Sequence, residues 1–186
     1  MKSSVTYFEQ KGKENTKETL ELAKERAIER GIRTIVVAST HGYTALEAAK
    51  VFSGLDVSIL AVTISAGFAD EGWRMTEEEK KQITQQGVSV LTTHMAFGGG
   101  IEDAFGEASP QSIVAQTYYT FSQGVKVAAE ITIMAAEADC LDLNQDVIAI
   151  AGTNGGADTA IVVKPAYARH FKDLRIKEII CKPQEG

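Results

Sequence analysis

Short apolar segments alternate with helical segments along the first half of this chain, and that alternation restricts the folds it can adopt. Apolar runs at residues 33–38, 57–63 and 88–92 are typical of buried strands. Residues 44–52 and 76–86, which lie between these runs, have the apolar spacing of helices. Strands and helices in alternation are joined by right-handed crossovers, so the sheet is parallel and helices cover both faces. We therefore predict an α/β protein with three layers, α/β/α.

The alternation breaks after the third expected strand, and this break determines the strand order. A long glycine-containing loop at residues 94–110 is followed by two helices in succession between residues 110 and 140. Two successive helices let the chain return across the sheet, so the fourth strand, residues 146–151, can pair with the first. Residues 161–164 follow too closely to be anything but its antiparallel neighbour. We expect a mixed five-stranded sheet of order 3-2-1-4-5, numbered along the chain, with strand 5 antiparallel.

The two ends of the chain add elements that this strand order does not include. Asn15 and Glu18 have capping-box spacing, and a helix that begins there should end at Gly31. Residues 175–181 alternate like a strand without an assigned place, and residues 5–8 are a candidate partner for them. The length of 186 residues fits one α/β domain over residues 1–186.

The composition excludes several classes of protein. The net charge is -6, from 25 acidic residues against 19 lysines and arginines without a basic run, so nucleic acid would be repelled. Cys140 and Cys181 lack the spacing of a zinc site, and we expect no metal. The N-terminus has no apolar signal core, and no apolar run approaches the roughly 18 residues of a membrane helix. We therefore expect a cytoplasmic protein that binds neither nucleic acid nor membranes.

A hydroxyl-rich turn follows the first expected strand and precedes a helix, in the segment TIVVASTHGYTALEAAK of residues 34–50. The residues of the turn are Ser39, Thr40, His41, Gly42, Tyr43 and Thr44. A glycine allows the tight turn, and the free amides at a helix N-terminus attract anions. Because no Walker lysine and no GxGxxG follow, the turn is neither a P-loop nor a dinucleotide fingerprint. It predicts a site for a phosphate group.

A glycine-rich loop follows the fourth expected strand, in the segment GTNGGADT of residues 152–159. The residues that we expect to contact a ligand are Gly152, Thr153, Asn154, Gly155 and Gly156. If strands one and four are neighbours, the turn and this loop face each other at a topological switch point, where open α/β sheets bind ligands.

These two segments together resemble the C-terminal α/β domain of pyruvate kinase, and more closely the small stand-alone proteins that consist of that domain. The resemblance runs from about residue 15 to residue 166. Pyruvate kinases have a Thr/Ser-x-Ser-Gly-x-Ser/Thr-Ala turn after an apolar strand, and Thr40, Gly42, Thr44 and Ala45 match it. They also have a strand, a glycine-rich loop and an antiparallel strand ending in Val-Val-x-Pro, which residues 146–166 repeat in the same order.

In that family the turn and loop form a pocket for a phosphorylated sugar, so the resemblance implies that residues 40–44 hold a phosphate. His41 stands where the kinases have Ser or Thr, and the tryptophan and arginine of their loop are missing, so a sugar bisphosphate is not the expected ligand. The catalytic barrel of pyruvate kinase is absent from this sequence. The resemblance therefore implies no phosphoenolpyruvate chemistry.

The stand-alone relatives resemble flavin mononucleotide (FMN) binders of unknown reaction, so the resemblance implies FMN as the cofactor. Tyr43, Phe68, Trp73 or Phe97 could stack on the flavin ring. Whether the chain is an enzyme stays open, because no catalytic group is evident. Residues that could act as an acid or base, although such loop residues are usually solvated, are His41, His94, Asp70, Glu71, Glu102 and Asp103.

A second function also stays open: a regulatory or assembly module that acts through a partner or through self-association, without catalysis. Tyr118, Tyr119 and Phe121 could supply its contact surface, although an ordinary core helix explains the same residues. A homo-oligomer would fit this hypothesis.

Overall fold

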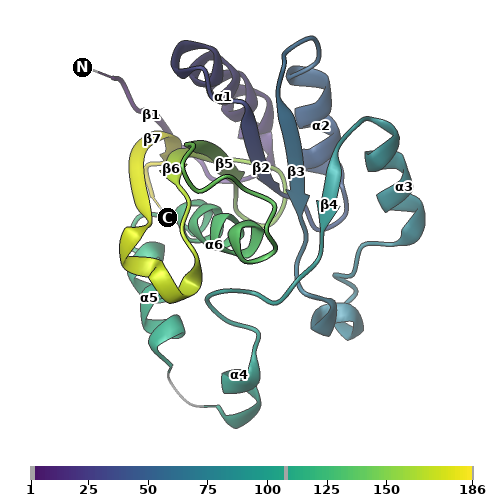
Figure 1. Ribbon diagram of the computed structural model, residues 1–186, viewed down its shortest axis with the longest axis vertical. Coiled ribbons are helices and arrows are strands. Elements are labelled where there is room, and N and C mark those ends of the chain that lie inside the picture. The colour runs from purple at the N-terminus through teal and green to yellow at the C-terminus, as the bar shows by residue number, and fades with distance from the viewer. Residues whose placement is uncertain (1–2, 107–108, 186) are drawn as a thin grey trace.

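A seven-stranded mixed sheet forms the centre of the protein, in a computed structural model that describes residues 3–106 and 109–185 (Figure 1). The strand order is β1-β7-β6-β5-β2-β3-β4. The strands are β1 (Thr6–Phe8), β2 (Thr34–Ala38), β3 (Ser58–Val62), β4 (Ser89–Leu91), β5 (Val147–Ala151), β6 (Thr159–Lys164) and β7 (Arg175–Pro183). The helices are α1 (Thr16–Arg30), α2 (Tyr43–Val51), α3 (Glu77–Gln85), α4 (Ile101–Phe105), α5 (Pro110–Tyr119) and α6 (Gln123–Glu137), with 3-10 turns η1 (Lys13–Asn15), η2 (Ala66–Glu71) and η3 (Ala168–Asp173).

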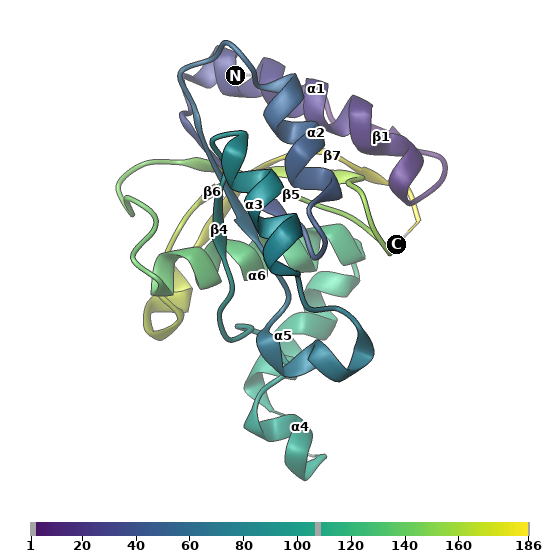
Figure 2. The same ribbon diagram turned by 90° about the vertical axis from the view of Figure 1, so that its right-hand side faces the viewer.

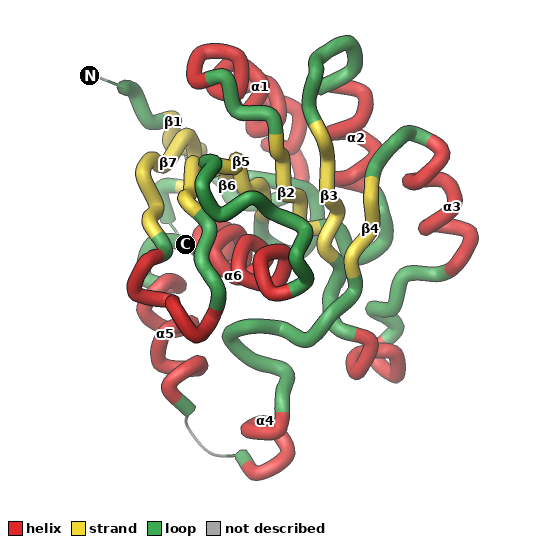
Figure 3. The backbone as a smooth tube through the Cα atoms, in the orientation of Figure 1, coloured by secondary structure: helices red, strands yellow, loops and turns green. Residues whose placement is uncertain are grey.

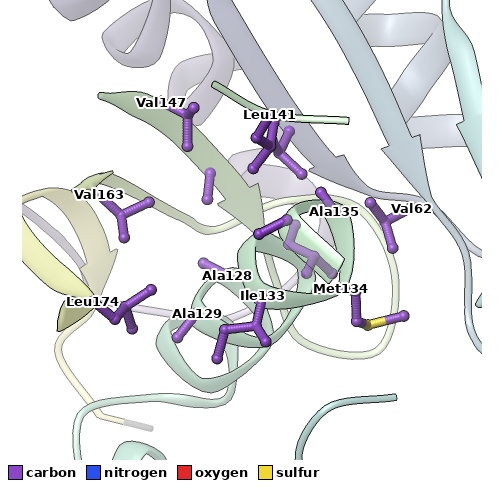
Figure 4. Close-up of a cluster of buried hydrophobic side chains, with 14 of the residues drawn as sticks. Val62, Ala128, Ala129, Ile133, Met134, Ala135, Leu141, Val147, Val163 and Leu174 are labelled. Carbon is purple, nitrogen blue, oxygen red and sulfur yellow. The ribbon is translucent and has the colours of Figure 1, made fainter. Parts of the chain in front are cut away.

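Helices cover both faces of the sheet, as the three-layer prediction requires. Alternate side chains of β2 point to opposite faces: Ile35 and Val37 pack with α1 and α2, whereas Val36 packs with α6. Helix α3 adds Ile83 to the α2 side. On the other face, α6 is buried along most of its length, and Figure 4 shows its apolar side chains gathered with those of the sheet. Burying one side chain such as Ile133 contributes about 1.5 to 3 kcal/mol.

The prediction of five strands is wrong, and the complete order differs because two more strands extend the sheet beyond β6. Strand β7 pairs antiparallel with β6, and β1 pairs in parallel with β7, so residues 5–8 do partner residues 175–181. Without β7 the edge of β6 would leave its backbone groups unpaired. The strand order around the predicted ligand site agrees with the prediction. Strand β2 pairs in parallel with both β3 and β5, and β5 pairs antiparallel with β6.

The ends of the helices agree with the sequence prediction at some positions only. Thr76 and Glu79 form a capping box at α3, and Gly31 ends α1 in the left-handed conformation, with φ 63°. Asn15 is the N-cap residue of α1 as predicted, but its side chain makes no capping hydrogen bond, and its amide donates to the Gln10 carbonyl. The Thr16 hydroxyl connects the start of α1 to a distant segment, since it accepts a hydrogen bond of 2.9 Å from the Ala157 amide.

None of the helices within residues 3–106 and 109–185 is both long enough and apolar enough to cross a membrane.

Candidate functional site

The turn after β2 and the loop after β5 lie together at the carboxyl ends of these adjacent strands, and both line one cavity of about 690 Å³. The predicted residues that line it are Ser39, Thr40, His41, Tyr43, Thr44, Gly152, Asn154, Gly155 and Gly156. Helix α6 forms another wall, and β3 contributes its last residue, Val62. The structure therefore brings most of the predicted site into one hollow.

The N-terminus of α2 presents free donors to this cavity. The Ala45 amide donates to the Ser39 hydroxyl at 3.2 Å, and the Leu46 amide donates to the Gly42 carbonyl at 2.9 Å. The amides of Tyr43 and Thr44 donate to no other residue in the described part of the chain. The Thr44 hydroxyl is likewise unpaired there, although Thr44 is only 4% exposed. Unpaired amides at the positive end of a helix, with a hydroxyl beside them, suit a phosphate.

Two of the predicted contact residues, Gly42 and Thr153, do not line the cavity. Gly42 has φ 91°, and a Cβ atom built on it would lie 2.7 Å from Ile83 Cδ1 and 3.1 Å from its Cγ1. The glycine is therefore required by the left-handed turn and by the packing of α3 behind it. Thr153 is buried, at 5% exposure.

His41 lies at the edge of the cavity and pairs with α3. Its Nδ1 atom is 3.2 Å from Glu79 Oε1, and both side chains are partly exposed. The Thr76 backbone amide, together with the Thr76 hydroxyl and His41, lowers the pKa of Glu79 below its ordinary 4.5, although partial burial opposes this shift. His41 thus links the turn to the capping box of α3.

The glycine loop packs closely against the N-terminal segment and is hydrogen-bonded to it. Gly156 has φ 68°, and a Cβ on it would lie 2.4 Å from the Thr16 hydroxyl and 2.8 Å from Lys13 Cα. The buried Asp158 carboxylate accepts hydrogen bonds from the Gly12 amide at 3.0 Å and the Thr159 hydroxyl at 2.9 Å. These contacts bring Lys13 to the cavity wall, with its Nζ 3.9 Å from the centre of the Tyr43 ring. Lys13 was not predicted from the sequence as a residue of this site.

A buried ion pair on α6 also lines the cavity, and it was not predicted from the sequence either. Lys126 is 5% exposed and Glu130 is 3% exposed. Lys126 Nζ donates to Glu130 Oε2 at 2.5 Å, and the Phe97 amide donates to Glu130 Oε1 at 2.8 Å. The sequence did contain a signal for this pair: a lysine and a glutamate lie four residues apart in an otherwise apolar helix. Charged residues are rarely buried without a partner, so this spacing indicates an ion pair.

Three of the four aromatic residues proposed for stacking, Tyr43, Phe68 and Trp73, line the cavity. The Phe68 and Trp73 rings stack on each other with centres 5.8 Å apart. Phe97 is wrong as a candidate, because it is buried in the core between the Tyr118 and Phe171 rings.

Of the loop residues proposed as an acid or base, His41 lines the cavity, and the others whose side chains the structure describes do not. His94, Asp70, Glu71 and Asp103 are exposed and line no part of it, and the Glu102 side chain lies outside the described residues. Within the described ranges, no three His, Cys, Asp or Glu side chains come together to hold a metal ion.

Comparisons with known proteins found one matching family model and several similar solved structures. The family model "Pyruvate kinase, alpha/beta domain" matches residues 17–163. A pyruvate kinase structure from Cryptosporidium parvum is similar over 81% of this chain and 23% of that chain, with 13% identity and a TM-score of 0.43. A second structure of the enzyme from this organism has 12% identity, the same 81% coverage, 22% of that chain and a TM-score of 0.41. A third, in complex with ADP, has 14% identity, 81% and 24% coverage, and a TM-score of 0.42. The chain thus spans under a quarter of each of these enzymes.

Proposed function

Because this chain belongs to the pyruvate kinase α/β domain family, we propose that it binds a phosphate-bearing small molecule, specifically FMN, in the cavity between β2 and β5. One observation carries the proposal: free amides at the start of α2 and the glycine loop after β5 line the same hollow. The cavity volume of about 690 Å³ suits a small molecule, since such sites measure about 300 to 1,000 Å³. We propose a cytoplasmic location for this binding.

The phosphate end of the ligand would lie at the turn. The amides of Tyr43 and Thr44 and the hydroxyls of Thr40 and Thr44 are the donors within reach of such a group, and Lys13 adds a positive charge to the same wall. Hydrogen bonds to a charged group contribute about 1.5 to 3 kcal/mol each. Several such bonds would make the phosphate a stronger anchor than the ring of the ligand.

The rest of the cavity suits a flat, largely apolar ring. Its apolar wall consists of Val62, Ile64, Met95, Val127, Ile131 and Met134. Phe68 and Trp73 stand at the wall as a stacked pair, and their ring faces could cover one side of a flavin. FMN therefore fits both the polar and the apolar parts of the site. When bound, it would supply redox chemistry.

Titration of FMN into the purified protein tests this function. We expect quenching of the flavin fluorescence with saturation, and competition by inorganic phosphate. A yellow protein with FMN identified by mass spectrometry would give the same answer from the cell. Absence of FMN binding would reject the proposal, and FMN binding without competition by phosphate would reject the phosphate site at the turn.

A second candidate function, self-association without catalysis, is supported by exposed apolar side chains near α4 and α5. Ile101 and Phe105 of α4 are 78% and 74% exposed, and Ile113, Tyr119 and Phe121 are 63%, 39% and 48% exposed. Helix α4 stands away from the sheet in both views (Figures 1 and 2). It follows the long loop that leaves β4 (Figure 3). Sedimentation equilibrium should detect an oligomer that Phe105→Ser weakens, and a monomer at every concentration would reject this alternative.

A further inference from the structure

Lys126 and Glu130 are buried charges in a helix that is otherwise packed against the core. Helix α6 buries Val125, Ala128, Ala129 and most of its other residues in the apolar layer. Removing two charges from water is costly, and their mutual attraction often only offsets that cost. Because two apolar residues would pack at least as well, stability alone does not account for a pair on the cavity wall.

The two residues of the pair differ in how many of their hydrogen-bonding groups are used. Both oxygens of Glu130 are engaged, one by Lys126 Nζ at 2.5 Å and the other by the Phe97 amide at 2.8 Å. An ammonium group has three N–H donors, and Lys126 uses one of them among the residues that the structure describes. The Tyr119 ring also lies near this charge, with its centre 5.8 Å from Nζ. Two donors of a 5% exposed lysine are therefore left for something in the cavity.

We propose that the Lys126 ammonium binds a carbonyl or anionic oxygen of the ligand, as a second polar anchor separate from the phosphate turn. Glu130 acts as the positioning residue, because it holds Nζ in place and is itself fixed by the Phe97 amide. The two anchors come from opposite layers, since α2 covers one face of the sheet and α6 the other. The inference rests on the proposed function, and for FMN it assigns Lys126 to the carbonyl edge of the ring.

The test separates the two anchors with three probes: FMN, riboflavin, which lacks the phosphate, and inorganic phosphate. Lys126→Met should weaken the binding of FMN and of riboflavin by the same factor, about tenfold or more, and should leave the binding of phosphate unchanged. Thr44→Val should weaken FMN and phosphate but not riboflavin. Lys50→Met is the matched control, because Lys50 also pairs with a glutamate, Glu47 at 2.6 Å, but on the surface of α2. It should change none of the three.

A second readout distinguishes ligand contact from a structural role. Reduced flavin is more electron-rich, so a positive charge at its carbonyl edge favours the reduced form. The midpoint potential of bound FMN, measured by titration with dithionite, should therefore fall in Lys126→Met and stay unchanged in Lys50→Met.

Loss of Lys126 would leave the Glu130 carboxylate buried and unpaired, which could unfold the protein. The double variant Lys126→Met/Glu130→Gln removes that charge and keeps an acceptor for the Phe97 amide, so it serves if the single variant fails to fold. Riboflavin affinity at the parent level in the folded variant would overturn the inference and leave the proposed function standing. A parent protein that binds neither flavin would reject both.

Discussion

Replacement of Thr44 by valine tests the phosphate site with the least disturbance of the fold. Thr44 is the second residue of α2, and its hydroxyl has no hydrogen bond to another residue within the described ranges. Valine has nearly the same shape, and its helix propensity is similar. The substitution therefore removes a donor that only a ligand could use.

The expected loss follows from the charge on the phosphate. A hydrogen bond to a charged group contributes about 1.5 to 3 kcal/mol, which corresponds to a roughly 10-fold to 150-fold weaker Kd for FMN. The stability of the fold should change little, because Thr44 does not cap α2. The N-cap residue is Gly42, and the side chain that accepts from an amide of the first turn is Ser39. We expect the unfolding free energy to stay within about 0.5 kcal/mol of the parent value.

Isothermal titration calorimetry with FMN measures the Kd, and urea denaturation measures the stability. Thr84→Val is the matched control, since Thr84 is an exposed helical threonine on α3 that does not line the cavity. It should bind FMN like the parent. If Thr44→Val also binds FMN like the parent, the anion does not contact this hydroxyl, and the placement of the phosphate at the turn is wrong.

Three other perturbations have defined outcomes. Gly42→Val should lose about 2 to 6 kcal/mol of stability, from strain at positive φ and overlap with Ile83, and an unchanged thermal midpoint would contradict this reason. Glu79→Gln should be less stable than the parent at neutral pH; because folding lowers the pKa of Glu79 below 4.5, the gap should close as pH falls through that lowered value, and a gap that persists in acid denaturation below it would refute the linkage. A thiol reagent at pH 8 should label the exposed Cys140 quickly, whereas burial raises the pKa of the Cys181 thiol to about 12, so rapid labelling of both thiols in the folded protein would be unexpected.

Some features of the site could be predicted from the sequence, and others could not. The turn and the loop were predictable because each follows a recognisable strand, and the neighbouring positions of β2 and β5 followed from the two successive helices before β5. The tight turn at Gly42 was predictable, and its φ of 91° agrees with it, but the contact with Ile83 was not, because a glycine looks the same in the sequence whether the turn alone or a neighbouring helix requires it. Its contact with Ile83 depends on how α3 packs.

By itself, the sequence determined the α/β class, the family resemblance and the positions of the turn and the glycine loop. These properties depend on local patterns: the period of apolar residues, and glycines and hydroxyls next to them. Only the tertiary structure decided that β7 and β1 extend the sheet, that Phe97 belongs to the core, and that Lys126 and Glu130 face the cavity. The physical reason is that a local pattern indicates that a side chain is buried, whereas its neighbours are decided by segments distant in the chain. The Phe97 amide meets Glu130 across 33 residues, and Ala157 meets Thr16 across 141.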